Sequence, residues 1–145
     1  MNIRDFFTEE QNVLIKTAIE KAELKTSGEI RLHLESECKG DAVKRGIELF
    51  HRLRMHKTKL RNGVLIYLAL NHKKLAVVGD EGIHHKVSEE FWHKVKDHMI
   101  ARFKNGQFTE GICEGIDMAG EVMKQHFPRQ KDTINELSDD ISFGN

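Results

Sequence analysis

Several features are scarce in this 145-residue chain, and each scarcity excludes a class of protein. The 23 basic side chains balance the 23 acidic ones, so no global field draws the protein to nucleic acid or to an anionic membrane. No window holds the roughly twenty apolar residues of a membrane helix. The two cysteines, Cys38 and Cys113, stand far apart and outside any metal-binding spacing, so we expect reduced thiols.

The first residues also lack the features of a signal peptide, namely a basic region, an apolar stretch and a small-residue cleavage site. We therefore expect a cytoplasmic protein, and a monomer. The length suits one domain with one core. Residues 1–128 are predicted to form this domain, and residues 129–145, acidic and weakly apolar, a loosely ordered tail.

Helical and strand patterns alternate in the first half of the chain. Residues 8–11 form a capping box that begins a helix, and this helix is predicted to stop at Gly28. Residues 29–35 alternate apolar and polar side chains, as a half-buried strand does. Asp41 begins a second helix. Its apolar stripe consists of Val43, Ile47, Phe50 and Leu53.

An apolar hairpin follows. Residues 64–70 are too short and too β-branched for a membrane span or a long helix, and they predict a strand buried on both faces. Residues 71–73 supply a polar turn, and residues 75–78 a return strand. Ser88 and Thr109 then begin two further helices. Three glycines inside the last helix indicate close packing of that helix on the sheet: Gly111, Gly115 and Gly120.

This order predicts an α/β fold, a three-layer αβα sandwich with a small mixed central sheet. The strand-helix-strand connection makes the first two strands parallel, and the short turn makes the third strand antiparallel to the second. Three glycine-containing loops are therefore expected to meet at one end of the sheet, at residues 27–29, 61–63 and 79–82.

Separated motifs of the chain resemble the TPM domain family, named for its thylakoid-lumen, photosystem-associated and receptor-modulator members. They are SGEI at 27–30, RNGVLIYLA at 61–69, VVGDEGI at 77–83, and a closing pattern of Phe103, Gly106, Phe108, Gly111, Ile112, Gly115 and Ile116. The resemblance covers about residues 6–127. It implies an αβα sandwich that binds a divalent metal, usually calcium, where loops cross at one end of the sheet.

The chain departs from the family in two ways. It lacks the usual export signal and membrane anchor, which argues against a role outside the cytoplasm. The loop before the second predicted strand is basic, with Lys57, Lys59 and Arg61, where many relatives carry acidic and glycine residues. This second departure bears on which residues would bind the metal.

A hard cation such as calcium needs six to eight oxygen ligands on tight loops. Asp80, between Gly79 and Gly82, is the first candidate, and the strand order places Glu29 across from it. Glu81 can reach the same ion or a neighbouring one, and Asn62 can offer an amide oxygen. The alternative is that Asp80 caps its turn and Glu29 is a solvated residue at a strand edge.

Other residues could also bind a metal. Glu35, Glu37 and Asp41 lie at the other end of the first strand, although Asp41 is equally a helix cap. Glu90 and His93 have the spacing of a di-iron helix, but such bundles need two of these motifs and the sequence shows one. His84-His85 lacks the further ligands of a zinc site, which favours a solvated loop.

Two functions follow from the resemblance and the residues. In the first, a divalent metal orders the crossing loops and thereby changes stability or the binding of an unidentified protein partner. In the second, the chain is a metal-dependent acid phosphatase, as some family members are reported to be, with Lys57, Lys59 or Arg61 holding phosphate. The sequence shows no nucleophile elbow, P-loop or dinucleotide fingerprint, which favours binding over catalysis.

Overall fold

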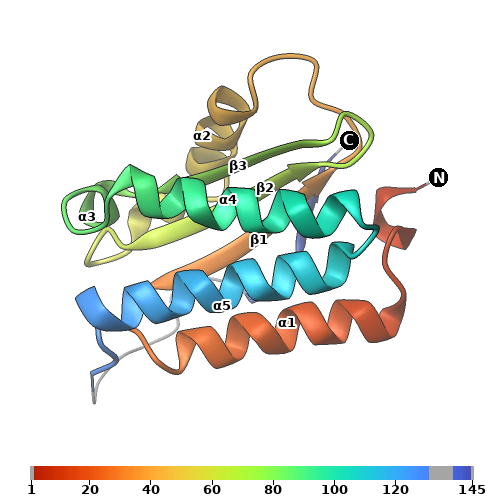
Figure 1. Ribbon diagram of the computed structural model, residues 1–145. Coiled ribbons are helices and arrows are strands. Elements are labelled where there is room, and N and C mark those ends of the chain that lie inside the picture. The colour runs from red at the N-terminus through yellow and green to blue at the C-terminus, as the bar shows by residue number, and fades with distance from the viewer. Residues whose placement is uncertain (1, 131–138, 145) are drawn as a thin grey trace.

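A computed structural model describes residues 2–130 and 139–144 and forms a three-layer αβα sandwich (Figure 1). The four strands lie in the order β3-β2-β1-β4. Their bounds are β1 (Glu29–Glu35), β2 (Gly63–Ala69), β3 (Lys74–Gly79) and β4 (Ser142–Gly144). The helices are α1 (Glu9–Glu23), α2 (Ala42–Arg52), α3 (Glu81–His84), α4 (Glu89–Lys104) and α5 (Phe108–His126), with short 3-10 turns η1 (Ile3–Asp5) and η2 (Met55–Lys57).

The sheet separates two apolar cores. Helices α1, α4 and α5 cover one face, over the larger core that contains Ile30, Leu32 and Ile66. Helix α2 lies on the other face, over a smaller core that contains Leu65 and Tyr67. Consecutive residues of β2 therefore point into different cores, which explains why every residue of this strand is buried, as its continuous apolar run predicted.

Sequence signals located most elements correctly. Thr8 forms the capping box of α1, and Asp41 and Ser88 accept hydrogen bonds from the first turns of α2 and α4. Strand β1 pairs with β2 in parallel, and β2 pairs with β3 antiparallel, as expected. Both cysteines are free thiols. In the described part of the chain, no helix has the length and apolarity needed to cross a membrane.

Some boundaries and faces differ from the sequence prediction. Helix α1 ends at Glu23 rather than at Gly28, and α5 begins at Phe108, with no side-chain cap from Gln107. The apolar stripe of α2 is only partly inward, because Val43 and Ile47 are 47% and 45% exposed. These two side chains lie beyond the edge of the smaller core.

The three glycines of α5 allow close packing, but the predicted partner was wrong. A Cβ on Gly111 or Gly115 would meet Phe103 or Met99 of α4, and a Cβ on Gly120 would meet Ala22 of α1. These glycines therefore let α5 approach its two neighbouring helices closely, while other side chains of α5 pack on the sheet. The sequence pattern shows that a close approach is needed but does not identify the neighbour.

Two elements were not predicted. Asp80 caps the four-residue helix α3, and residues 142–144 form β4 beside β1 in the segment predicted to be a loose tail. Residues 131–138 and 145 of that predicted tail lie outside the described residues.

Candidate functional site

The three loops predicted to converge do meet at one end of the sheet. Gly63 begins β2 and lies beside Glu29 of β1. Toward β3, the Gly63 carbonyl accepts a hydrogen bond from the Asp80 amide at 3.0 Å. Gly79 pairs with Val64 in the antiparallel register. The strand order therefore sets the positions of Glu29, Gly63 and Asp80, side by side across three strands.

Arg61 holds Asp80 in a bidentate ion pair. Its Nε and Nη2 donate to Oδ2 and Oδ1 of Asp80, each at 2.8 Å, and its Nη1 lies 3.4 Å from Glu81 Oε1. The Asp80 side chain is 5% exposed, whereas that of Arg61 is 39% exposed. Such fork-to-fork contacts are among the strong hydrogen bonds of proteins. We refer to this ion pair as the Arg61–Asp80 clasp.

The clasp joins two loops that cross. A Cβ on Gly82 would lie 2.6 Å from the carbonyl oxygens of both Leu60 and Arg61. The Gly82 amide donates to the Arg61 carbonyl at 2.9 Å. Arg61 itself has a left-handed backbone, with φ 51°, which turns its side chain back toward Asp80. Glycine is therefore required at position 82 because the other loop passes directly against it.

The remaining predicted ligands lie apart from the clasp. Asn62 is 1% exposed, and its side-chain amide donates to Ser27 Oγ at 3.3 Å. Glu29 is 2% exposed and lies on the far side of Gly63 from Asp80. A Cβ on Gly63 would lie within 3.7 Å of Met55 and Phe50, so these side chains fill the space above it.

The structure therefore brings Asp80 and Glu81 together around Arg61, whereas Glu29 lies on β1 and Asn62 directly before β2, apart from this ion pair. Across residues 2–130 and 139–144, no three histidine, cysteine, aspartate or glutamate side chains are arranged so that they could hold a metal ion. Asp80 also accepts a hydrogen bond from the Glu81 amide, at 2.8 Å, and so acts as a helix cap as well.

Glu29 has an acidic neighbour at the end of α1. Glu23 accepts a hydrogen bond from the Ile30 amide at 2.8 Å and is 7% exposed. Burial, a hydrogen bond with Asp139 and the charge of Glu29 together raise the pKa of Glu23 to about 10. Glu23 is therefore protonated at neutral pH, and the pair carries less negative charge than its sequence suggests.

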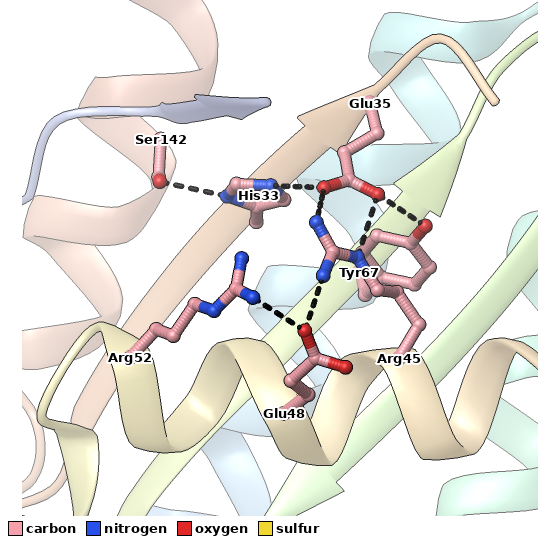
Figure 2. A network of polar contacts seen from close by, with 7 residues as sticks. All are labelled: His33, Glu35, Arg45, Glu48, Arg52, Tyr67 and Ser142. Carbon is pink, nitrogen blue, oxygen red and sulfur yellow. Dashed lines mark hydrogen bonds and ion pairs between the residues drawn. The ribbon is translucent and has the colours of Figure 1, made fainter. Parts of the chain in front are cut away.

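A second polar network lies on the α2 face of the sheet (Figure 2). Glu35 is fully buried and accepts hydrogen bonds from Arg45, from Tyr67 Oη at 2.7 Å, and from His33 Nε2 at 3.2 Å. Arg45 also contacts Glu48 of its own helix at 2.8 Å. The network thus ties α2 to β1 and β2.

Of the three carboxylates predicted at this end of β1, only Glu35 belongs to the network. Asp41 caps α2, with its Oδ1 2.8 Å from the Val43 amide. Glu37 borders a polar hollow together with Asp41, Lys44 and two residues of the network, Arg45 and Glu48. The three carboxylates therefore have different roles.

The network keeps its charges in fixed states. Burial alone raises the pKa of Glu35, but hydrogen bonds from Arg45, Tyr67 and His33 outweigh it and hold that pKa below its ordinary value. Burial lowers the pKa of His33 and raises that of Tyr67. At neutral pH the network is therefore an ion pair between Glu35 and Arg45 that accepts hydrogen bonds from two neutral rings.

His33 also connects the network to the C-terminal strand. Its Nδ1 lies 2.7 Å from Ser142 Oγ, so a line of hydrogen bonds runs from Ser142 through His33 to Glu35. The order of groups is that of a serine hydrolase triad, but His33 is 3% exposed and Arg45 neutralises Glu35. The contacts fit a structural role, which is to fasten β4 onto β1.

Sequence reasoning missed His33, Arg45 and Tyr67. The available signal was the presence of polar residues next to a buried strand. His33 and Glu35 lie on β1, which pairs with the buried apolar strand that contains Tyr67. Polar side chains that a sheet buries must find partners, and here they find one another.

Comparisons with known proteins agree with this geometry. The sequence matches the TPM domain family over residues 2–122. A search of curated proteins gives no match. The solution structure of the BA42 protein from the psychrophilic bacterium Bizionia argentinensis is 43% identical, with a TM-score of 0.92 and 99% of each chain covered.

A second solved structure is more distant. It is the N-terminal domain of a protein from P. gingivalis, with 18% identity, a TM-score of 0.69, and coverage of 86% of this chain and 82% of that one. At this identity the likeness supports the fold alone.

Proposed function

This chain belongs to the TPM domain family, and from that premise we propose that it is a non-catalytic binding module whose Asp80 loop takes up a divalent cation, calcium, in competition with Arg61. Uptake of the ion reorganises the crossing loops and thereby changes stability and the binding of a protein partner. The proposal describes a monomeric, cytoplasmic protein. Asp80 and Glu81 are the primary ligands, and Glu29 on β1 and Asn62 directly before β2 support the loop.

The observation that carries the proposal is the Arg61–Asp80 clasp. A buried carboxylate that is held by a single partly exposed guanidinium can exchange that partner for another cation without unfolding the sheet. The Arg61 guanidinium lies where the two loops cross. When the Arg61 side chain moves into solvent, an ion could occupy the same position.

The donor chemistry of the loops fits a hard cation. Both oxygens of Asp80, the exposed carboxylate of Glu81 and the carbonyl groups near Gly82 are oxygen ligands of the kind that calcium prefers. Arg61 is the residue that opposes binding. The occupancy of the site therefore depends on competition between one tethered cation and one free cation.

A calcium titration of chelator-treated protein tests this proposal. We expect affinity of roughly micromolar order, in the sensor range, with changed amide NMR shifts at residues 61–63 and 79–82. Asp80→Asn keeps the helix cap but removes an anionic ligand, so it should weaken binding. Arg61→Gln removes the competing charge and should strengthen binding by about tenfold, the effect of roughly one strong hydrogen-bonded contact.

Lys57→Gln is the matched control, because it removes one positive charge nearby without touching Asp80. Its calcium affinity should stay close to that of the wild type, since screened charges act weakly at a distance. Unchanged shifts around residues 61–63 and 79–82 would disprove the site. Equal affinities of the wild type, Arg61→Gln and Asp80→Asn would move the ion elsewhere.

The alternative function is that of a metal-dependent acid phosphatase. In that case Lys57, Lys59 or Arg61 would hold the phosphate, but Arg61 already holds Asp80. We expect hydrolysis of p-nitrophenyl phosphate far below the median enzyme turnover of about 10 per second, with or without calcium. A turnover near that median, lost in Asp80→Ala at an unchanged melting temperature, would establish the enzyme instead.

A further inference from the structure

Strand β3 lies at an edge of the sheet, at the base of a groove of about 550 Å³. Helix α2 forms one wall of the groove and α4 the other, and both helices pack against β3. Val77 and Val78 lie at the base, between the two walls. Gly46 lets α2 approach closely, since a Cβ there would be 2.9 Å from Val78 Cγ2.

The backbone of this edge is available for pairing. The Asp80 amide donates to Gly63, which makes these two residues a hydrogen-bonded pair of the antiparallel ladder. Because such pairs alternate, Leu75, Val77 and Gly79 turn their N–H and C=O groups away from β2, toward the groove. An edge of this kind is a template for another strand.

The edge also lacks the features that usually prevent pairing. Between Lys74 and Asp80 it has neither a charged residue nor a proline, and its sequence is Leu-Ala-Val-Val-Gly. Edges of soluble proteins are commonly blocked by charges, proline or bulges. Here the two helices limit access, because they recess the edge between them.

The two walls differ in chemistry. The α2 wall presents the exposed apolar side chains of Val43 and Ile47. The α4 wall carries Trp92, His93 and the positively charged Lys96, with the acidic Glu89 at the start of the helix. Successive side chains of an added strand would point alternately to the two walls. A matching strand therefore alternates apolar side chains, for α2, with acidic side chains that can pair with Lys96 of α4.

We propose that this groove binds an extended segment of a partner protein as an added strand, with apolar and acidic side chains in alternation. Main-chain hydrogen bonds to Leu75, Val77 and Gly79 would give affinity, and the two walls would give specificity. The inference goes beyond ion binding at Asp80 and does not depend on it.

A second copy of the chain fits the groove poorly. Its own β3 is recessed between the same two helices, so the walls of both copies would collide before the edges could pair. A single extended peptide has no such walls. The recessed edge therefore selects a thin partner.

The test uses the full-length ¹⁵N-labelled protein and an end-blocked hexapeptide of alternating valine and glutamate, which is about as long as β3. At millimolar peptide we expect amide shifts centred on β3, and at least tenfold slower hydrogen exchange of the Leu75 and Val77 amides. A peptide with N-methyl groups along one edge cannot pair and should not bind. The corresponding valine-lysine peptide should bind more weakly.

Two variants and a matched control complete the test. Ile47→Glu should weaken binding of the valine-glutamate peptide at least tenfold, and Lys96→Glu should reverse the preference toward the valine-lysine peptide. Val13→Glu places the same charge on an exposed apolar residue of α1, so it should leave binding unchanged. Ile47 is 45% and Val13 58% exposed, so neither substitution buries a charge, and cooperative melting of both variants near the wild-type temperature shows that both fold.

Several outcomes would overturn the inference. They are the absence of binding at millimolar peptide, unprotected Leu75 and Val77 amides, equal binding of the N-methylated peptide, or equal losses in Ile47→Glu and Val13→Glu. The measurement is made with chelator and again with calcium. If the peptide protects the Leu75 and Val77 amides in the presence of chelator, the groove binds peptide even if the Asp80 site binds no ion. The two proposals can therefore fail independently.

Discussion

At the scale of single residues, Arg61 joins two loops that lie nineteen positions apart in the chain. Sequence reasoning placed both loops at one end of the sheet, because strand order alone determines that. It did not pair Arg61 with Asp80, since a contact between two side chains nineteen positions apart depends on rotamers and backbone angles that no local pattern specifies. The predicted location was therefore accurate, whereas the contacts within it required side-chain geometry.

Glu35 allows a sharp test of the buried network. We expect Glu35→Gln to lower the free energy of unfolding by about 3 kcal/mol, because it leaves Arg45 without its buried partner. Chemical denaturation of both proteins would measure the difference.

Glu48→Gln is the matched control. It makes the same substitution at another partner of Arg45, but Glu48 is 49% exposed, so the loss should stay within about 0.5 kcal/mol. Equal losses of unfolding free energy in the two variants would mean that the burial of Glu35 does not make its contacts more stabilising than those of Glu48.

At the scale of elements, sequence signals succeeded where the information was local. The capping box at Thr8, the alternation of Glu29–Glu35 and the apolar run of β2 each locate an element by themselves. The alternation was wrong about burial, because β1 is buried on both faces rather than half-buried. Strand β4 has only three residues and exists through its pairing with β1, so no local pattern could reveal it. Helix α3, with four residues, is too short for periodicity.

The glycines of α5 show how the neighbouring element decides the effect of one substitution. Replacing Gly115 or Gly120 by alanine gains about 1 kcal/mol of helix propensity. At Gly120 the new Cβ would lie 2.8 Å from Ala22 Cβ and 3.3 Å from its Cα, which cannot move without shifting α1. We expect Gly120→Ala to destabilise the protein by about 1–3 kcal/mol.

Gly115→Ala provides the comparison. Its Cβ would meet the flexible side chain of Met99, which can change rotamer. We expect this variant to melt at a higher temperature than Gly120→Ala, because a side chain can adjust where the backbone of α1 cannot. The packing of α5 against α1 would be looser than described if Gly120→Ala melted at the same temperature as Gly115→Ala.

At the scale of the whole molecule, Glu23 makes stability depend on pH. Its pKa is about 10 in the folded protein, against an ordinary value of 4.5. Unfolding therefore releases a proton between these values, so the contribution of Glu23 is fully present below pH 4.5 and is lost as the pH rises toward 10. Relative to Glu23→Gln, the wild type should lose stability steadily across this range.

Denaturation at several pH values checks this prediction. Glutamine keeps an oxygen for the Ile30 amide but cannot ionise, so the variant should show a flatter profile. Glu121→Gln, at an exposed partner of Lys25, should follow the wild type above pH 5. Parallel profiles of the wild type and Glu23→Gln would show that Glu23 is ionised in the folded protein.

Calcium is expected to stabilise the fold if it binds as proposed. A ligand that binds only the native state adds about 2.7 kcal/mol at a hundredfold excess over its Kd. For a chain of this size, this corresponds to a rise of several degrees in melting temperature, at roughly 3 °C per kcal/mol. Asp80→Asn should lose the rise. A wild-type melting temperature that is indifferent to both calcium and chelator would contradict the expectation.

The unequal covering of the two sheet faces has a consequence for motion. In the described part of the chain, α2 is the one long helix over the smaller core, which also contains Met55 of η2, whereas three helices share the larger core. Proteins open in cooperative units, and a unit that buries less apolar surface opens at a lower free energy. Lifting α2 would break the Glu35–Arg45 ion pair but leave the packing of α1, α4 and α5 intact. We therefore expect faster amide exchange in α2 than in α1, α4 and α5, and faster exchange still in α2 when Glu35→Gln removes the ion pair.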